Sequence, residues 1–387
     1  MPSEHYLTER RPLAGIFQSH LAEALKNKGH NVCIVSAGLI PARFVLSYPY
    51  KPNENYQGIK IYRLYRRLCL PGRLINKLFY QKIVSFYLKL FHKCITENFK
   101  PHLVHAHNCL FAGIAARQIK RRFHVPYIIT EHSSIFMHKK LSYKHKELIS
   151  TALTDSAVNT VVSNALKKKF YELFPAEKKP FHTVFNIIEK QFVDINENTI
   201  RKFSNKTSSF VFLNVASLDR NKNQAGLLRA FSKAFKGQHN LKLKLVGHGS
   251  LMDSLKNLTS DLGIEKQVEF LGLLGRRDIL QEFLKCNAFV LSSYHETFGV
   301  SLIEALACGK PVISTRCGGP EDIVDESNGL LVPPGDVESM AYALREIYQR
   351  ILNGYFDCIS IRSKIIQKFG PDAIVDKLEK YYLQAIS

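Results

Sequence analysis

The stretch from Ser292 to Glu321, SSYHETFGVSLIEALACGKPVISTRCGGPE, decides the fold prediction. The apolar residues just before it predict a strand, which ends in a loop holding Glu296 and Gly299. A helical run from Val300 to Cys308 follows, and Gly309 stands where a helix commonly ends. A second apolar strand comes directly after it. The stretch therefore predicts a strand–loop–helix–strand unit, which is typical of a parallel α/β sheet.

Two acidic residues in this unit, Glu296 and Glu304, are separated by seven residues. At a rise of 1.5 Å per residue the helix places them roughly 12 Å apart. This exceeds the separation of about 5 to 9.5 Å at which two carboxylates act on one glycosidic bond. Free amides at the helix N-terminus between them favour an anion such as a diphosphate. An isolated pair of acids would be ordinary surface residues, but the E-x-F-G, A-x-G-x-P-V and G-G-x-E elements around them favour a site for an elongated ligand.

The stretch closely resembles the E-x7-E signature of the family 4 retaining glycosyltransferases. The resemblance implies the GT-B fold, in which two α/β Rossmann-like domains face each other across a cleft. It also implies that Glu296 contacts hydroxyls of the donor sugar and that Glu304 holds the ribose of the nucleotide. The backbone amides of Phe298, Gly299 and Val300 would contact sugar and phosphate.

A second segment, VASLDRNKNQAGLLRAF from Val215, resembles the strand–loop–helix in which the family binds the donor diphosphate. Lys222 stands at the family's Lys position, where its charge and the helix dipole would act on the same phosphate. Ser217 replaces the usual Arg, and we expect Arg220 to substitute for it. Gly247 and Gly249 match the family's G-x-G turn, a weak signal on its own because such pairs also close ordinary strand–helix turns.

In the first half, PLAGIFQSHLAEAL resembles the family's glycine loop, in which Gly15 would let backbone approach the phosphate. His132 in IITEHSS corresponds to the family's functional His near donor sugar and acceptor. It follows a predicted strand, and open α/β sheets bind ligands at the carboxyl ends of their strands. His105 and His107 also lie near a strand end, where we expect structural roles.

The composition is that of a globular protein of more than one domain. The chain has 387 residues, of which 45% are hydrophobic, and this length exceeds one ordinary core. Its eight cysteines include no C-x-x-C pair, so neither a zinc site nor a disulfide framework is expected. No apolar run is long enough to span a membrane, and we expect a cytoplasmic protein.

Strand and helix patterns alternate in two series, which predicts two domains. We expect residues 1–190 to form an N-terminal acceptor-side domain and residues 191–370 a C-terminal domain that binds the nucleotide sugar. A polar segment, 189–209, is the best linker candidate. By the resemblance, a last helix over 371–385 would pack back on the first domain.

The positive charge is concentrated in the first half. Residues 1–190 carry 30 Lys and Arg against 11 Asp and Glu (+19), whereas the remainder carries 24 against 22 (+2). Residues 55–96 contain no acid and interleave basic with aromatic residues. A solvated basic helix face is one explanation, and nucleic acid is another. The apolar stripe and the donor signature favour peripheral binding to an anionic membrane surface, with no nucleic acid partner.

The pattern departs from the family at the N-terminus. Family members begin with an apolar strand near the middle of the sheet, but no apolar run precedes Leu13 here. We therefore expect the first strand of the N-terminal domain to be missing, which puts activity in question.

The sequence thus predicts a retaining glycosyltransferase that moves a sugar from a nucleotide-diphosphate donor to an acceptor hydroxyl, in polysaccharide or lipid-linked glycan synthesis. No metal and no cofactor are expected, since the nucleotide sugar is a substrate. Two other classes stay open. A nucleotide-sugar epimerase on the same fold would need an acid or base pair at the sugar, and none is identified. An inactive homologue that binds membrane or nucleic acid would leave the E-x7-E site empty.

Overall fold

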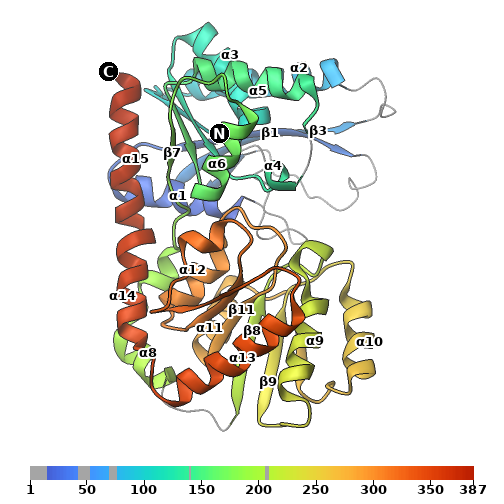
Figure 1. Ribbon diagram of the computed structural model, residues 1–387. Helices are drawn as coiled ribbons and strands as arrows, with labels where there is room; N and C mark the ends of the chain where they lie inside the picture. Colours follow the sequence, from blue (N-terminus) through green and yellow to red (C-terminus); the bar gives the residue numbers. More distant parts are fainter. Residues whose placement is uncertain (1–14, 42–52, 69–75, 139–140, 205–208) are drawn as a thin grey trace. The chain divides into compact units, whose positions relative to one another are not determined.

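The computed structural model describes residues 15–41, 53–68, 76–138, 141–204 and 209–387 (Figure 1). The chain divides into two compact units. The first unit comprises residues 1–187 together with 371–387, and the second comprises residues 188–370. No helix in the described ranges is long and apolar enough to cross a membrane.

The second unit is built on a six-stranded sheet in which every pairing is parallel. Its strands are β8 Phe210–Val215, β9 Leu241–Val246, β10 Val268–Gly272, β11 Ala288–Leu291, β12 Val312–Thr315 and β13 Gly329–Val332. Their order across the sheet is β10-β9-β8-β11-β12-β13. Strands β9 and β10 therefore extend the sheet on one side of β8, and β11, β12 and β13 extend it on the other side. This is the order of a Rossmann-type sheet, with its topological switch point between β8 and β11.

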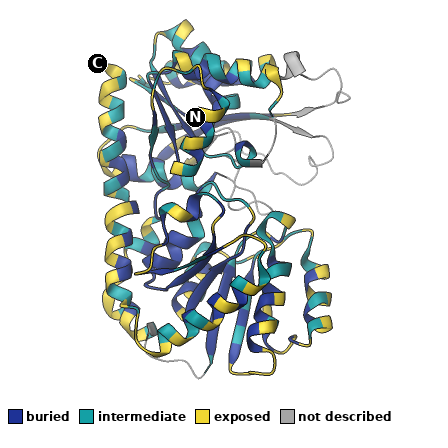
Figure 2. Cartoon of the chain, viewed as in Figure 1, coloured by how far each residue is buried: buried dark blue, intermediate teal, exposed yellow. Residues whose placement is uncertain are grey.

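Helices cover both faces of this sheet, as Figure 1 shows. One face carries α9 Gln224–Phe235, α10 Met252–Leu262 and α13 Val337–Leu352, whose apolar residues form one core with the strands. The other carries α11 Arg276–Lys285, α12 Val300–Ala307 and α14 Cys358–Phe369. Figure 2 shows the strands buried between helices whose outer faces are exposed. Burial on both faces explains why the strands are continuous apolar runs instead of alternating ones.

The first unit contains two separate sheets. A parallel four-stranded sheet consists of β4 Val104–His107, β5 Tyr127–Glu131, β6 Val158–Val161 and β7 Phe181–Thr183. In a three-stranded sheet, β1 Cys33–Pro41 pairs in parallel with β3 Ile59–Leu68, and β2 Asn53–Tyr56 is antiparallel to β3. The longer helices of this unit are α1 Ile16–Asn27, α2 Asn76–Thr96, α3 Ile114–Phe123, α5 Tyr143–Asp155, α6 Asn164–Leu173 and α15 Pro371–Ile386.

The basic region 55–96 differs from its prediction. It contains β3, which the sequence did not predict, and its aromatic residues Tyr62, Tyr87 and Phe91 are buried in the core and not at a lipid surface. The apolar stripe of α2 likewise packs against β1 and β3. Lys82 and Lys89 are exposed on the opposite side of the helix. These exposed lysines are therefore available to a charged partner, whereas the three buried aromatic side chains are not.

The prediction that 189–209 is a linker is also wrong for most of its length. This segment forms α7 Lys190–Val193 and α8 Glu197–Ser204. Arg362 of α14, which is only 5% exposed, holds the segment in place. Its guanidinium donates hydrogen bonds to the carbonyl oxygens of Phe192 (2.8 Å), Val193 (2.5 Å), Ile195 (2.8 Å) and Ala307. One buried cation thus satisfies four carbonyls, three of them at the C-terminal ends of α7 and α12, where helices leave carbonyls without partners.

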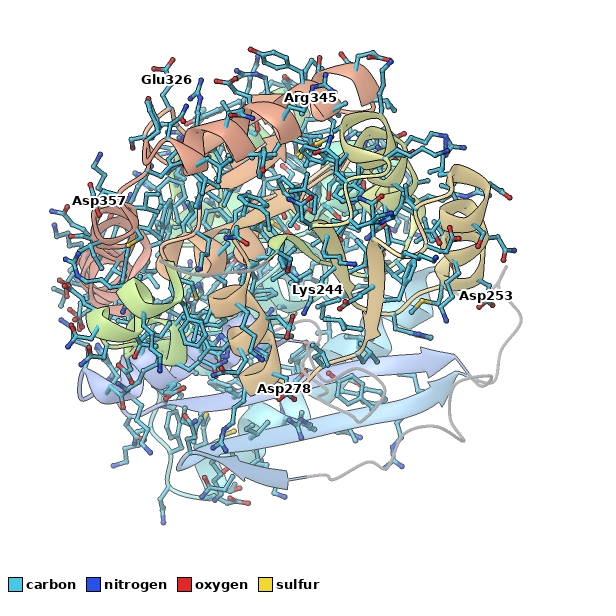
Figure 3. The ribbon with its side chains drawn as sticks, turned by 90° about the horizontal axis from the view of Figure 1, so that it is seen from below. Lys244, Asp253, Asp278, Glu326, Arg345 and Asp357 are labelled. Atoms are coloured by element: carbon cyan, nitrogen blue, oxygen red, sulfur yellow. The ribbon has the colours of Figure 1, made fainter. Side chains whose placement is uncertain are left out.

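We expect Arg362→Met to lower the free energy of unfolding by about 2–4 kcal/mol, because four buried carbonyls lose their donors. Thermal and urea unfolding of the purified protein would measure this loss. Arg345→Met is the matched control, since Arg345 is exposed on α13 (Figure 3). Equal midpoints for the two variants would contradict this role of Arg362.

A cavity of about 790 Å³ lies in the first unit between the edges of β1 and β4. Its walls include Cys33 to Val35 on one side, Leu103 to His107 on the other, and Leu21 and Leu25 of α1. Within the described ranges, β1 pairs only with β3 and β4 only with β5. The cavity therefore separates two strand edges whose outward backbone groups could each pair with a further strand. The expected absence of a first strand concerns residues 1–14, which lie outside the described residues.

An apolar strand should fill this cavity. We expect five alternating Val and Ile residues, placed ahead of residue 1, to raise the melting temperature by about 4 °C or more, because they bury apolar surface and complete two strand ladders. Hydrogen exchange should slow at Cys33 to Val35 and at Val104 to His107. The control extension carries Pro at its centre, which removes a ladder donor. Unchanged exchange with the all-apolar extension would show that the cavity does not accept a strand.

Candidate functional site

The site of the second unit lies at the switch point of its sheet. β8 and β11 are neighbours, paired at Ala288–Phe212 and Phe289–Leu213. The helices that follow them, α9 and α12, leave toward opposite faces, and the loops after the two strands lie at the edge where open α/β sheets bind ligands. These loops contain Lys222 and Glu296, the two predicted site residues that the fold brings together.

Side-chain caps fix the loop that follows β8. Asp219 Oδ1 accepts hydrogen bonds from the amides of Asn221 (2.9 Å) and Lys222 (3.2 Å), which forms a short 3-10 turn. Ser217 Oγ donates to the other carboxylate oxygen of Asp219 at 2.6 Å. The residue that replaces the family's Arg thus stabilises the turn that carries Lys222.

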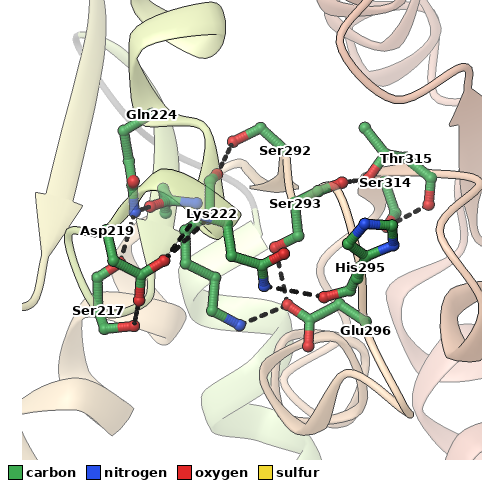
Figure 4. Close-up of polar contacts among 12 residues, drawn as sticks. Ser217, Asp219, Lys222, Gln224, Ser292, Ser293, His295, Glu296, Ser314 and Thr315 are labelled. Carbon is green, nitrogen blue, oxygen red and sulfur yellow. Dashed lines mark hydrogen bonds and ion pairs between the residues drawn. The ribbon is translucent and has the colours of Figure 1, made fainter. Parts of the chain in front are cut away.

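The two loops are joined by direct hydrogen bonds (Figure 4). The Tyr294 amide donates to the Asn221 carbonyl at 2.8 Å, and Asn221 Nδ2 donates to the His295 carbonyl at 3.0 Å. Ser292 Oγ donates to the Lys222 carbonyl at 2.7 Å. These contacts fix the position of Lys222 relative to the loop that holds Glu296.

Lys222 and Glu296 form an ion pair in which Nζ lies 2.5 Å from Oε1. Ser293 Oγ donates to the same oxygen at 2.7 Å. The lysine side chain is 22% exposed and the glutamate side chain 14%, so the pair borders solvent. Burial works against the lysine charge, but the Glu296 carboxylate outweighs it, and the pKa of Lys222 is raised. The lysine is therefore a permanent cation at this edge of the sheet.

Gly247 and Gly249 form the turn after β9, which packs directly on the loop after β8. A Cβ atom on Gly247 would lie 1.9 Å from the Ala216 carbonyl oxygen, and one on Gly249 would lie 2.1 Å from that of Leu218. Only glycine permits this backbone contact, so the G-x-G turn supports the loop that carries Lys222.

The N-terminus of α12 supplies amides beside Glu296. Gly299, with φ 107°, caps the helix without a side-chain bond. The amides of Gly299, Val300 and Ser301 have no hydrogen-bond acceptor in the described part of the chain. The Phe298 ring is buried against Phe369, with ring centroids 5.6 Å apart. Phe298 therefore anchors the loop, while the glycine and the first helical residues present donors to an anion.

Glu304, one turn into α12, is buried and contacts Arg276 at the start of α11. Arg276 also contacts Glu189, so one guanidinium joins two carboxylates. The sequence analysis did not identify Arg276 or Glu189. A basic doublet directly after a predicted strand was a possible signal for Arg276, whereas nothing in the sequence marks Glu189.

Arg220, the expected substitute for the family's Arg, is exposed, and no hydrogen bond or ion pair is found for it among the described residues. The same residues contain no group of three or more His, Cys, Asp or Glu that could hold a metal ion.

His132 lies in the first unit at the end of β5. Its Nδ1 is 3.1 Å from Asn186 Oδ1, and its Nε2 is 2.9 Å from His107 Nδ1. Because the amide oxygen can only accept, Nδ1 of His132 carries the proton and Nε2 accepts from His107. Burial lowers the pKa of His132 to about 3, so the ring is neutral near pH 7. Both ring nitrogens thus have partners within the unit, and His132 is not a free base.

Glu131 holds the backbone around His132. Its buried carboxylate accepts hydrogen bonds from the amides of Cys109 (2.7 Å), His132 (2.9 Å) and Ser133 (2.7 Å). The Phe17 ring, on the first turn of α1, lies 4.7 Å from the His132 ring. Gly15, with φ 76°, caps that helix, so the first unit brings Gly15 and His132 to the same region.

Two family models match the chain and together cover most of it. The model described as Glycosyltransferase Family 4 matches residues 15–192, and the model described as Glycosyl transferases group 1 matches residues 196–350.

Known proteins resemble the whole chain as well. N-acetyl-alpha-D-glucosaminyl L-malate synthase of Bacillus anthracis is 25% identical over 382 residues, covering 96% of this chain and 94% of that protein. Among solved structures, sucrose-phosphate synthase from Thermosynechococcus elongatus matches with a TM-score of 0.75 at 21% identity, over 95% and 92% of the two chains. HepE of Anabaena in complex with UDP matches with a TM-score of 0.71 at 17% identity, over 98% and 97%. The predicted fold class is confirmed: the chain belongs to the family 4 glycosyltransferases and has their GT-B fold of two Rossmann-like domains.

Proposed function

We propose that the protein transfers a sugar from a nucleoside diphosphate donor to an acceptor hydroxyl with retention of anomeric configuration. The C1–oxygen bond to the diphosphate breaks, and the diphosphate leaves with the electron pair. The acceptor oxygen bonds to C1 on the same face and passes its proton to the departing diphosphate oxygen. The observation that carries the proposal is the Lys222–Glu296 pair at the switch point, beside the free amides of α12.

In this proposal Lys222 and the α12 amides stabilise the diphosphate as its charge develops. Fixed donors and cations in a partly water-excluded site contribute most where charge appears in the transition state. Since these groups offset the charge themselves, the proposed mechanism uses no metal ion. The diphosphate of a bound donor competes with Glu296 for Lys222.

When the diphosphate replaces Glu296 as the partner of Lys222, the Glu296 carboxylate becomes available to the sugar. Once Lys222 turns to the diphosphate, the Glu296 carboxylate can accept hydrogen bonds from sugar hydroxyls. Glu304, deeper in the unit, holds the ribose. The neutral His132 ring would replace its hydrogen bond to Asn186 or His107 by one to a hydroxyl of the sugar or of the acceptor. Gly15 would let the start of α1 approach the donor. A nucleotide ligand is supported by the UDP bound to HepE, which shares the fold.

For the acceptor we propose a polysaccharide or lipid-linked glycan at an anionic membrane surface. α2 and α3 pack together in the first unit. Lys82 and Lys89 of α2 and Arg122 of α3 are exposed, and no acidic partner is found for them within the described ranges. Each such residue near an anionic bilayer contributes about 1 kcal/mol.

Donor binding tests the main proposal. Calorimetry with UDP, GDP and ADP should show one preferred nucleotide, and Lys222→Met should weaken its binding about 10- to 100-fold because a charge-assisted contact to phosphate is lost. Lys244→Met is the control, since Lys244 pairs with Glu282 (2.9 Å) and Glu269 (3.7 Å) on neighbouring elements (Figure 3).

Binding of none of the three nucleotides would overturn the proposed function. If the preferred nucleotide bound but its sugar were converted without an acceptor, the protein would be an epimerase instead.

Membrane binding is tested separately with vesicles containing phosphatidylserine. We expect pelleting that decreases with salt and that falls sharply in the triple variant Lys82→Glu, Lys89→Glu, Arg122→Glu, because each reversal replaces attraction with repulsion. The control reverses the exposed Lys236, Lys256 and Lys266 of the second unit, with the same change in net charge. Equal losses in both variants would show that only total charge matters.

A further inference from the structure

Arg276 occupies an unusual position beside the proposed ribose site. It is the first residue of α11, directly after the loop that follows β10. Its Nε donates to Glu189 Oε2 at 2.7 Å, and its Nη2 contacts both Glu189 and Glu304. The guanidinium also lies 5.3 Å from the centre of the Phe192 ring, which restricts its motion. The arginine is thus fixed by three groups from two segments of the second unit, the start of α7 and the helix α12.

Glu304 is the most deeply buried member of this cluster. Its side chain is 4% exposed, against 14% for Glu189 and 21% for Arg276. The pKa of Glu304 is raised, because burial raises it more than the charge and hydrogen bond of Arg276 lower it. The nearby Glu189 carboxylate also raises the pKa. Without the guanidinium, burial and the second carboxylate would raise the pKa further and favour the protonated form of Glu304.

No cation other than Arg276 contacts the Glu304 carboxylate in the described part of the chain. Arg362 of α14 directs its donors to four backbone carbonyls, and Lys190 of α7 pairs with Asp194 at 2.7 Å. The Cys308 thiol, one turn further along α12, is buried and its pKa is raised. β11 and β12 have no charged side chain. The charge state of Glu304 therefore depends on Arg276.

The second oxygen of Glu304 is where a ligand would bind. Arg276 holds Oε1, and Oε2 makes no hydrogen bond to any described residue. A carboxylate with one oxygen held by arginine presents the other in a fixed direction. An ionised carboxylate only accepts hydrogen bonds, whereas a protonated one also donates. A ribose hydroxyl donates best to the ionised form.

We infer that Arg276 is a positioning residue for the nucleotide, holding the Glu304 carboxylate ionised and oriented so that it selects a ribose hydroxyl over a deoxyribose. This inference rests on the proposed function of Glu304. It assigns to Arg276 a role in recognition of ribonucleotides that does not require direct contact with the ligand.

The test compares a ribonucleoside diphosphate with its 2′-deoxy and 3′-deoxy analogues by calorimetry between pH 6 and pH 9. The wild-type protein should prefer the ribonucleotide over at least one analogue about tenfold, with little change across this range. In Arg276→Met most of that preference should be lost at pH 6 and should return as pH rises. The sign follows because the unpaired Glu304 has a raised pKa, so its carboxylate form grows as pH increases.

Three further variants separate the possible causes. Arg276→Lys should recover much of the preference at pH 6, because it restores a cation. Glu304→Gln should lose the preference at every pH, since the amide cannot ionise. Arg277→Met is the control, because Arg277 is exposed and next in sequence. Should Arg276→Met fold poorly, Arg276→Met combined with Glu189→Gln removes the second carboxylate and gives the same pH test.

The outcomes distinguish this inference from the proposed function. If the wild-type protein binds no nucleoside diphosphate, the proposed function fails. If it binds the ribonucleotide selectively but Arg276→Met keeps that selectivity at pH 6, Arg276 does not position Glu304 and the inference alone is overturned.

Discussion

The order of the strands in the second unit is the constraint on which its site depends. Strands β9 and β10 are added on one side of β8, and strands from β11 onward are added on its other side. The two loops that follow β8 and β11 therefore come together at one edge of the sheet. Lys222 and Glu296 are 74 residues apart in sequence, and this strand order makes them neighbours. The glycines after β9 and the hydrogen bonds between the loops then fix a geometry that the strands have already imposed.

The sequence predicted the elements of the second unit closely because their signals are local. The alternating strands and helices expected in this unit are present, since strands buried on both faces are uninterrupted apolar runs between polar turns. α12 ends where Gly309 adopts φ 69°. β3 was missed because arginines and tyrosines interrupt its apolar pattern. Its Arg63 is nevertheless buried, which only long-range packing could decide.

Side-chain partners were less predictable than elements. The polar composition of 189–209 is typical of a linker, yet Arg362, some 170 residues away, makes its carbonyls part of a folded structure. Arg276 contacts Glu189 and Glu304 across 87 and 28 residues. Such contacts depend on which helix ends meet, and a single sequence carries no signal for that. The positions of Glu296, Glu304 and Lys222 were predictable through the resemblance, whereas their partners were not.

The two ion pairs of the candidate site, Lys222–Glu296 and Arg276–Glu304, have the same chemistry but opposite requirements. Lys222 is near solvent, and in the proposed mechanism a diphosphate replaces Glu296 as its partner. Arg276 is anchored by two carboxylates and an aromatic ring, so its contact with Glu304 should survive nucleotide binding. A lysine is a mobile point charge, whereas an arginine forms several hydrogen bonds in a fixed plane. Lysine therefore suits the position where the partner must be exchanged, and arginine suits the position where a buried carboxylate must stay ionised.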